Sequence, residues 1–363
     1  MTALADFEQL DDSPAFRAVH ALCERAEREI RLIDRAQPLN VAAERARLIA
    51  ELRAGRAARA KLEYAPCPEL SSLRAELERA SVTLDALGSL GQLYAARARE
   101  LTCEAELAEA IGAPDFAARA AARFPADSGV DGRAAEQMAS EWAQSFSARA
   151  RGSHCSDDER DAESLLSVLR RRALELGLRV RVEVRATQAA AASVGDGFIA
   201  VRPGLWHTAS EVARIALHEL EGHALPRMRA RSERLALFRV GCAQSSEDEE
   251  GRALWLEERA GLCDAARKAE LALRHLTARA VRDGASFAEA AALLGALGAE
   301  PERVVDTALR AYRGGGLGRE LCYLVALSRV SRAFAEEPAL AAWLARGRVS
   351  VAAARVLERA ATR

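Results

Sequence analysis

The chain has 363 residues, long enough to bury the core of one large domain or of two ordinary ones. Its formal net charge of −1 argues against general electrostatic binding to nucleic acid or to an anionic membrane. Arginine supplies almost all of the positive charge. Together with the abundant alanine this matches the codon bias of a GC-rich genome, so the arginine count alone indicates no function.

The seven cysteines are odd in number, scattered along the chain and without a C-x-x-C pair. This pattern argues against a disulfide framework or a cysteine zinc site and favours reduced thiols. The first residues lack the basic and apolar regions of a signal peptide, and no segment approaches the ~18 uninterrupted apolar residues of a membrane span. We therefore expect a soluble, cytoplasmic protein.

Helices are predicted for almost the whole segment from Pro14 to Gln144, which is rich in Ala, Leu, Arg and Glu and poor in β-branched residues. Proline or glycine interrupts the pattern at residues 37–40, 65–68 and 112–115, where we expect the helices to break. No internal repeat is evident.

A polar stretch without periodicity, residues 147–160, is predicted to be a linker in which His154 and Cys155 are exposed loop residues. The chain is therefore expected to divide into an N-terminal helical region, residues 1–150, and a second domain, residues 151–363.

The pattern changes after the linker. Apolar and charged residues alternate over 178–185, which predicts a half-buried strand, and residues 197–201 predict a second short strand. A helix is expected to begin near Thr208 or Ser210, with Glu211 in its first turn. From Ser246 onward the sequence predicts helices, apart from the glycine cluster at residues 314–316.

The predicted helix carries the most informative motif of the chain, IALHELEGHALP. Glu219 directly follows His218, and His223 comes five residues after His218. Two imidazoles and a carboxylate are what a zinc hydrolase needs, because the histidines bind the metal and the carboxylate acts as general base. In H-E-x-x-H the two histidines lie about 40° apart around an α-helix, whereas the present spacing separates them by about 140°. A functional motif therefore requires a distorted helix, and Gly222 is where a π-bulge or an early helix end is easiest.

A third metal ligand is expected in the acidic segment 245–253, because catalytic zinc usually has three protein ligands. Ser246 and Glu249 have the spacing of a capping box, which opens a helix. Glu250 is the preferred ligand, since Gly251 beside it permits a close approach of backbone or metal, and Glu249 is the alternative. Acidic residues at helix starts are also common as solvated groups that stabilise the helix dipole.

These motifs together resemble the metallopeptidase family that contains the microtubule-associated tyrosine carboxypeptidases, whose bacterial members carry a Q-E-G-L-A motif. The H-E-x-x-x-H motif is followed about thirty residues later by E-E-G-x-A. Residues 36–40, Glu44 and residues 62–64 resemble the family's N-terminal P-x-N…E…F-x-Y pattern, and residues 313–324 resemble R-G-G-G-F-T-K-D-x-x-Y-L. The similarity spans roughly residues 35 to 325.

The chain departs from the family pattern at several positions. Glu249 replaces the usual glutamine and Arg252 replaces a leucine, while Gly318, Arg319 and Glu320 stand where the family has Thr-Lys-Asp. The expected ligands match but the surrounding residues differ. The chemistry is therefore better supported than the substrate.

The resemblance implies that His218, His223 and Glu250 bind one Zn²⁺ per chain. It also implies that Glu219 takes a proton from the attacking water and passes it to the leaving amine. Tyr323, or else Tyr312, is a candidate to stabilise the oxyanion, although either is equally suited to a structural role.

Substrate binding is expected near the glycine cluster. Arg313 and Arg319 flank the cluster and are candidates to bind the terminal carboxylate of a substrate, which arginine does bidentately. Gly315 lies in a segment that either admits a substrate backbone or simply forms a turn. The other histidines, His20, His154, His207 and His275, have structural or loop positions.

The sequence thus predicts a predominantly helical α+β fold, with a zincin-like metallopeptidase core, a small β-sheet and an N-terminal helical region. Strands followed by the motif helix are the order seen in zincins, although this is fold-level analogy. The expected activity is zinc-dependent carboxypeptidase action on the C-terminal tail of a peptide or protein, with no nucleic-acid or membrane partner. The alternatives are a metal-dependent endopeptidase that processes a small peptide and a catalytically silent helical interaction protein.

Overall fold

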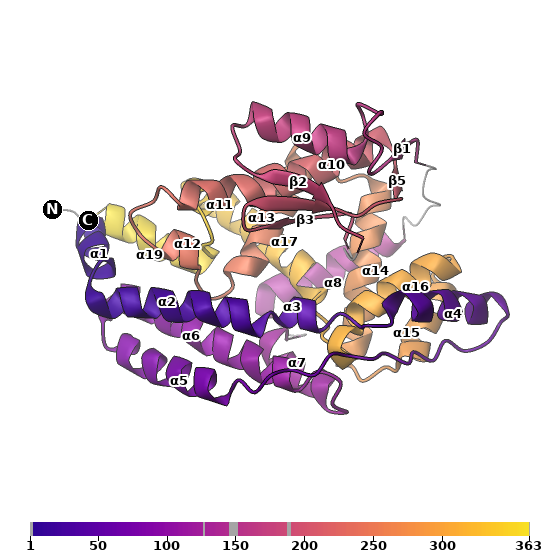
Figure 1. The fold of residues 1–363 in the computed structure, drawn as a ribbon, viewed down its shortest axis with the longest axis horizontal. Helices are drawn as coiled ribbons and strands as arrows, with labels where there is room; N and C mark the ends of the chain where they lie inside the picture. The colour runs from indigo at the N-terminus through magenta and orange to yellow at the C-terminus, as the bar shows by residue number, and fades with distance from the viewer. Residues whose placement is uncertain (1–2, 126–127, 145–151, 187–189, 363) are drawn as a thin grey trace. The chain divides into compact units, whose positions relative to one another are not determined.

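Helices form most of this protein, as the sequence predicts, and five short strands accompany them in a computed structural model (Figure 1). The structure describes residues 3–125, 128–144, 152–186 and 190–362. Within these ranges no helix has both the length and the apolar character needed to cross a membrane. The expected mainly helical α+β fold is confirmed.

The chain folds into two compact units, each built from separate stretches of sequence. Unit 1 comprises the described residues of Met1–Asp11, Ser147–Ala266 and Ala326–Arg363, and unit 2 those of Asp12–Phe146 and Arg267–Val325. In unit 2, α16 (Pro301–Ala311) packs against α4 (Val41–Arg53), so helices far apart in sequence lie in one unit. Which residues form the catalytic domain therefore stays a prediction.

Unit 1 contains both sheets and most of the smaller helices. Its elements are α1 (Ala3–Asp11), β1 (His154–Cys155), α9 (Leu165–Glu175), β2 (Arg181–Val184), β3 (Ala192–Gly195), β4 (Phe198–Val201), β5 (Trp206–His207), α10 (Ala209–Leu217), η1 (His218–Ala224), α11 (Leu225–Ala230), α12 (Leu237–Val240), α13 (Ser245–Arg259), α18 (Leu340–Leu344), α19 (Val351–Ala361) and most of α17 (Leu321–Glu336).

The main sheet of unit 1 has the strand order β2-β4-β3, with β2 parallel and β3 antiparallel to the central strand β4. Ile199 on β4 pairs with Val182 on one side and Val194 on the other. Apolar residues of the sheet form one core with α9, α10 and η1, which include the fully buried Leu169 and nearly buried Leu220. Figure 1 shows α9 and α10 beside this sheet. The sheet therefore supports the motif helix directly.

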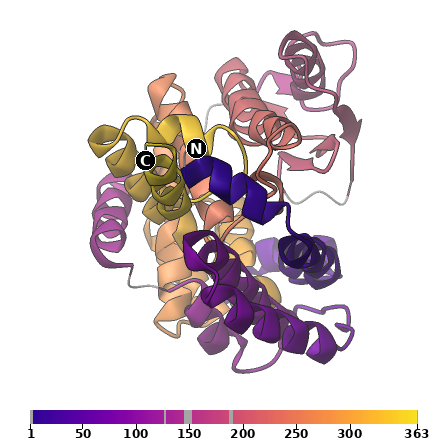
Figure 2. The same ribbon diagram turned by 90° about the vertical axis from the view of Figure 1, so that its left-hand side faces the viewer.

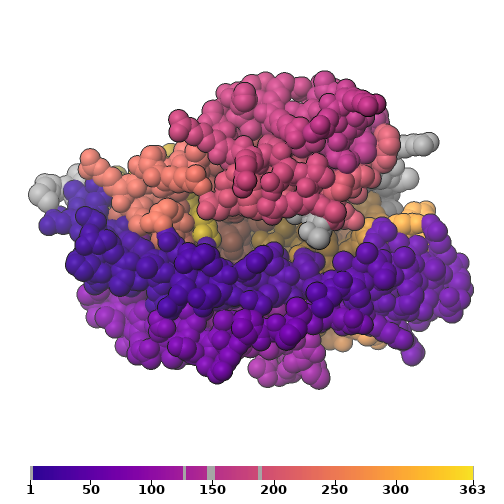
Figure 3. Space-filling model, viewed as in Figure 1, coloured from indigo at the N-terminus to yellow at the C-terminus, as the bar shows by residue number. Residues whose placement is uncertain are grey.

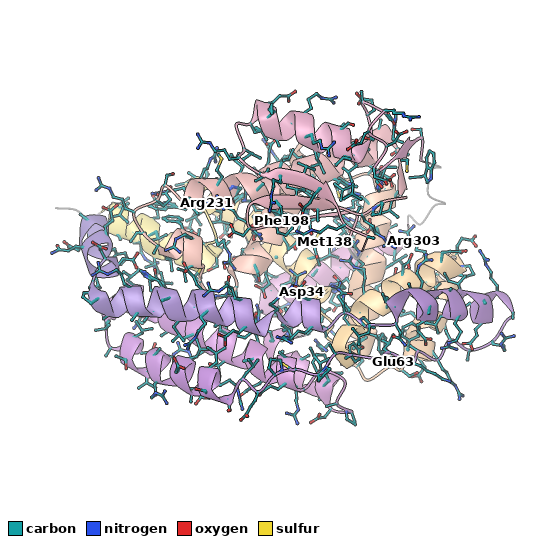
Figure 4. All side chains as sticks on the ribbon, viewed as in Figure 1. Asp34, Glu63, Met138, Phe198, Arg231 and Arg303 are labelled. Atoms are coloured by element: carbon teal, nitrogen blue, oxygen red, sulfur yellow. The ribbon has the colours of Figure 1, made fainter. Side chains whose placement is uncertain are left out.

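Both predicted strands of the sheet form, although β2 is shorter than the expected strand at residues 178–185. Strand β3 was not expected, because its alanine-rich approach lacks alternation. Arg185, which directly follows β2, lies over the ring of Phe198 at the start of β4, 3.8 Å from its centroid. At the turn between β3 and β4, Arg231 binds Asp196; Figure 4 labels Phe198 and Arg231.

The expected linker is partly wrong. Residues 147–151 lie outside the described residues, but His154 and Cys155 form β1, paired antiparallel with Trp206 and His207 of β5. Both residues are half-buried rather than exposed, and Nδ1 of His154 lies 2.7 Å from Asp161. Strand pairing and this ion pair order a segment whose polar composition suggested a loop.

The two ends of the described chain meet in unit 1. Helix α1 packs beside α19, which Figure 2 shows close to both chain termini. Asp11 at the end of α1 accepts a 2.6 Å hydrogen bond from the backbone amide of Ala236. The first helix is thus part of unit 1, although it precedes the long helical segment in sequence.

Helices joined by loops form unit 2, and its described residues contain no strand. Figure 3 shows α2 in indigo along the surface of this unit. Its elements are α2 (Pro14–Ile30), α3 (Leu32–Arg35), α4 (Val41–Arg53), α5 (Ser71–Asp85), α6 (Gly88–Glu109), α7 (Phe116–Arg123), α8 (Gly129–Ala143), α14 (Ala265–Arg282), α15 (Phe287–Ala296), α16 (Pro301–Ala311), η2 (Arg313–Gly315) and the start of α17.

The expected breaks fall between α3 and α4, between α4 and α5, and between α6 and α7. The second break is an extended segment held by the motif residues before it. Asn40 donates to the carbonyl of Lys61 and accepts from the amide of Glu63, while Glu44 accepts from the amide of Lys61 and binds Arg47. The N-terminal motif residues Asn40 and Glu44 therefore have a structural role, because they hold the extended segment after α4 in place.

The glycine turn, residues 313–318, and the residue before it are hydrogen-bonded to parts of unit 2 that are distant in sequence. The amide of Gly314 donates to the carbonyl of Ala36, and its carbonyl accepts from the amide of Gly112. The Tyr64 hydroxyl donates to the carbonyl of Tyr312 just before the turn. Gly314 has a φ of 69°, and a Cβ there would lie 2.7 Å from the Phe116 ring. Only glycine fits this position.

Candidate metal centre

The helix that carries the histidine motif begins where the sequence predicts. Thr208 precedes α10, its side chain accepts from the amide of Glu211, and the Glu211 carboxylate accepts from the amide of Thr208. This reciprocal capping box stabilises the helix start. Val212 and Ile215 face the core beside the sheet. The local sequence therefore anchors the segment that leads into the motif.

The motif itself forms a π-helical turn, η1, from His218 to Ala224. Hydrogen bonds in a π-helix join residues five apart, so His218 and His223 come to lie on the same face. Their ring centroids are 4.9 Å apart. The predicted distortion is confirmed. Gly222 contributes because a Cβ there would lie 2.7 Å from the Cβ of Ala253, which lets η1 pack closely against α13.

Three ligand atoms converge at this turn. The Nε2 atoms of His218 and His223 lie 3.4 Å and 3.7 Å from the same oxygen, Oε2 of Glu250. The ligand atoms of the three residues all lie within 4.8 Å of one another. This set matches the three expected ligands, and it combines donors from η1 and α13.

The second nitrogen of each imidazole faces another carboxylate. Nδ1 of His218 lies 2.7 Å from Oε1 of Glu257, and Nδ1 of His223 lies 3.1 Å from Oε1 of Glu249. A carboxylate at Nδ1 favours the tautomer whose Nε2 lone pair is available to a metal. Both lone pairs are then directed toward Glu250. The donor set therefore fits a metal ion.

Each of these carboxylates is in turn bound by an arginine. Arg214 lies 3.7 Å from Oε1 of Glu257, and Arg227 lies 3.1 Å from Oε1 of Glu249 while also donating to the carbonyl of Val194 on β3. Burial raises the pKa of Glu249, but its interactions with Arg227 and His223 together outweigh burial and hold that pKa well below its usual range. Each histidine therefore lies next to a glutamate that is paired with an arginine, but only Nδ1 of His218 is hydrogen-bonded to its glutamate.

The surroundings of His218 favour positive charge. Burial lowers its pKa, but the hydrogen bonds with Glu250 and Glu257 outweigh that effect and raise the pKa to about 10. The carboxylates that stabilise a proton on the imidazole stabilise a divalent cation in the same way. Electrostatics and donor geometry therefore agree on a cation site.

Glu219, the expected general base, is a buried residue of η1 with 9% of its surface exposed. Its charge interacts with those of His218 and Arg227. The carboxylate therefore lies within the electrostatic field of the ligand cluster, next to the first ligand in sequence.

The expected capping box at α13 is wrong. The helix begins at Ser245, and the Ser246 hydroxyl donates to Glu247 rather than capping the helix. Glu249 instead faces His223 and Arg227, so it is not part of the ligand set. Charge pairing with these two partners outweighs the weaker preference of a glutamate for a helix start.

Glu257 was missed from the sequence. It is fully buried on α13, seven residues after Glu250, and two helical turns place both side chains on the same face. This i, i+7 spacing was the available signal. An acidic residue that shares a helix face with a metal ligand is a candidate to orient a histidine.

The residues expected to bind substrate belong to unit 2 rather than to the unit that holds the ligands. Arg313 is buried, donating to Glu320 at 2.7 Å and to the carbonyl of Arg310. Arg319 is half-buried and donates to the Tyr323 hydroxyl at 3.0 Å. Gly315 is exposed on the glycine turn, with a φ of 105°.

Tyr312 has a structural environment. Its hydroxyl donates to the carbonyl of Ala285 and its ring packs against Phe287, with 5.2 Å between the centroids. Burial raises its pKa above the usual range. Of the two candidate phenols, Tyr323 is the one that contacts a half-buried arginine.

Comparisons with known proteins point to one family. A family model described as microtubule-associated tyrosine carboxypeptidase matches residues 55–363. Among proteins with curated descriptions, none matches the chain. A solved structure of a candidate lipoprotein from Colwellia psychrerythraea is similar over 80% of this chain and 66% of that chain, with 14% identity and a TM-score of 0.46. The family match includes every element of the metal centre.

Proposed function

The chain belongs to the microtubule-associated tyrosine carboxypeptidase family, and on that premise we propose that it is a zinc-dependent carboxypeptidase. Its substrate is the C-terminal tail of a peptide or protein. The observation that carries this proposal is the convergence of two imidazole nitrogens and one carboxylate oxygen at the π turn. Two histidines and one glutamate are a known ligand set of catalytic zinc.

The proposed ligands are His218, His223 and Glu250, and zinc is the proposed metal because imidazole and carboxylate suit it. When bound, zinc supplies a Lewis acid that polarises the scissile carbonyl and makes a water molecule acidic at neutral pH. The protein contributes the orientation of the ligands, since Glu257 and Glu249 fix the two imidazoles.

Glu219 is the proposed general base. It takes a proton from the attacking water and returns that proton to the leaving amine, so it serves both halves of the hydrolysis. Its burial supports this role, because a shielded carboxylate is less solvated and its interactions with charges are stronger.

Tyr323 and Arg319 are the proposed substrate-binding pair in unit 2. Tyr323 donates a hydrogen bond from its hydroxyl to the developing oxyanion, and Arg319 binds the terminal carboxylate while its guanidinium contacts the phenol. Arg313 has a supporting role in this scheme, because it is already buried against Glu320. Gly315 is a proposed point of substrate approach, since it is exposed and lacks a side chain.

Hydrolysis of peptides by the purified protein tests the proposal. Peptides ending in tyrosine with a free carboxylate are compared with the same peptides carrying a C-terminal amide, and zinc content is measured alongside. We expect about one zinc per chain and removal of the last residue from the free peptide only. Glu219→Gln should keep the zinc and lose about 10²- to 10⁴-fold in kcat.

Three other results contradict the proposal in distinguishable ways. Cleavage inside amidated peptides identifies an endopeptidase. Zinc binding without hydrolysis of any peptide in a library supports a silent interaction protein. Absence of zinc from the purified protein, even after incubation with Zn²⁺, removes the metal centre altogether.

A further inference from the structure

The π turn leaves one main-chain carbonyl without its regular donor. The amide of Leu225 donates to the carbonyl of Leu220, five residues earlier, as the π-helical pattern requires. The next bond in this pattern would join residue 226 to the carbonyl of Glu221. Residue 226 is proline, which has no N–H. The Glu221 carbonyl therefore needs a donor from elsewhere, because an unsatisfied buried carbonyl is costly.

Arg252 of α13 supplies that donor. Its Nη2 atom lies 2.6 Å from the carbonyl oxygen of Glu221 and 2.7 Å from that of Gly222. The side chain is buried, with 7% of its surface exposed. The guanidinium of an arginine is a permanently charged donor. A charged donor makes these hydrogen bonds stronger than neutral ones.

The packing of α13 explains how Arg252 reaches the turn. A Cβ at Gly222 would lie 2.7 Å from the Cβ of Ala253, and one at Gly251 would lie 2.5 Å from the carbonyl oxygen of Ala326 on α17. These glycines let α13 lie close to both neighbours. Arg252 is then fixed opposite the π turn, two residues after the ligand Glu250. The same helix therefore supplies one ligand and the support for the other two.

We infer that Arg252 is a positioning residue of the metal centre, which holds the π turn in the form that brings His218 and His223 onto one face. The inference rests on the proposed metal site. A regular α-helix would separate the histidines by about 140°. The leucine of the resembling family donates no hydrogen bond at this position, so the two hydrogen bonds of Arg252 go with a departure from the family pattern.

Metal affinity measured on the full chain tests this inference. We compare wild type with Arg252→Leu, using Zn²⁺ in competition with a chromophoric chelator and the visible absorption spectrum of the Co²⁺-loaded protein. Arg252→Leu is expected to weaken Zn²⁺ binding by about 10- to 100-fold and to change the Co²⁺ spectrum. Arg229→Leu is the matched control, because Arg229 donates to the carbonyl of Ala345 instead and should leave both readouts unchanged.

A second substitution makes the test specific for the missing hydrogen bond. Pro226→Ala restores an N–H at the position whose donor is absent, so it should recover most of the affinity lost in Arg252→Leu. If Arg252→Leu does not fold, Arg252→Lys keeps the charge with different donor geometry. In that background Pro226→Ala is again expected to raise the affinity.

The outcomes separate the inference from the function on which it rests. A folded Arg252→Leu protein with wild-type Zn²⁺ affinity and an unchanged Co²⁺ spectrum overturns the inference alone. Failure of Pro226→Ala to recover affinity in either background also overturns it, because a purely structural arginine would not respond to that N–H. Failure of wild type to bind Zn²⁺ overturns the proposed metal site itself.

Discussion

The π turn of unit 1 and the glycine turn of unit 2 both contain main-chain carbonyls without a regular backbone donor. In both turns an arginine side chain donates to them. At the π turn Arg252 donates to the carbonyls of Glu221 and Gly222. The guanidinium of Arg282 donates to the carbonyls of Gly316 and Leu317 in the glycine turn. It also donates to the carbonyls of Ala117 in α7 and of Phe124 at the end of that helix. In both places irregular backbone leaves acceptors that a helix would otherwise satisfy.

The two turns differ in the side chains that they carry. At the π turn the side chains of His218 and His223 remain available and converge on Glu250. The glycine turn carries few side chains. The guanidinium of Arg282 fills the space that a side chain at Gly318 would need, because a Cβ there would lie 2.8 Å from it. The π turn positions the candidate ligand side chains, whereas the glycine turn determines the path of the main chain. Substitutions should therefore affect metal binding at the first and stability at the second.

The largest expected effect is loss of the metal. His218→Ala combined with His223→Ala removes two of three ligands, so zinc should fall from about one per chain to background. Metal content by mass spectrometry, on protein purified without a histidine tag, measures this. Stoichiometric zinc in the double variant would show that the ligands are assigned wrongly.

The next largest effect is expected on stability in unit 2. Arg282→Leu leaves several carbonyls without their donor, at about 1–3 kcal/mol for each one that stays buried. Chemical denaturation should show a loss of about 3 kcal/mol or more, while the folded protein keeps wild-type Zn²⁺ affinity. Arg279→Leu, which removes ion pairs of a more exposed arginine on the same helix, should cost much less. Equal losses in the two variants contradict the comparison.

A smaller effect is expected when the orientation of one ligand is disturbed. Glu257→Gln keeps an acceptor near Nδ1 of His218 but removes its charge, so Zn²⁺ affinity should fall by about 10- to 100-fold with little change in thermal stability. The exposed carboxylate of Glu175 on α9 serves as control, and Glu175→Gln should leave affinity unchanged. Unaltered affinity in Glu257→Gln would mean that the imidazole is oriented by packing alone.

The smallest effect concerns the hydroxyl of Tyr64, which donates to the carbonyl before the glycine turn. Tyr64→Phe keeps the ring, so only one hydrogen bond is lost and the free energy of unfolding should fall by about 1 kcal/mol. Thermal unfolding measures this loss, and zinc content should stay at the wild-type level. A simultaneous loss of zinc would mean that the glycine turn supports the metal centre as well.

The sequence predicted the metal centre better than its surroundings. The spacing of His218 and His223 demanded a distorted helix, because no regular helix brings residues five apart onto one face, and the π turn is that distortion. Glu250 was preferred to Glu249 because Gly251 follows it, and Glu250 is the carboxylate that converges with the two imidazoles. These predictions succeeded because they depend on local geometry, which the order of residues determines.

The supporting residues depend on tertiary contacts, which a local pattern does not contain. Glu249 was expected to cap α13, but it pairs with Arg227 from another helix. Arg252 appeared to be only a departure from the family pattern, since a charged residue gives no sign in the sequence that it will be buried. Strand β3 was missed because an alanine-rich segment becomes a strand only through pairing with β4.

The attachment of α13 to the C-terminal part of unit 1 has a consequence for biosynthesis. Asp248, two residues before the ligand Glu250, is fully buried and accepts hydrogen bonds from Arg329 and from the backbone amide of Val351. Neither donor has been synthesised when α13 leaves the ribosome. A buried carboxylate without partners is strongly unfavourable, so this helix reaches its final position only after residue 351 has emerged. Because Glu250 lies on this helix, we expect the proposed metal site to be complete only after residue 351 has been synthesised.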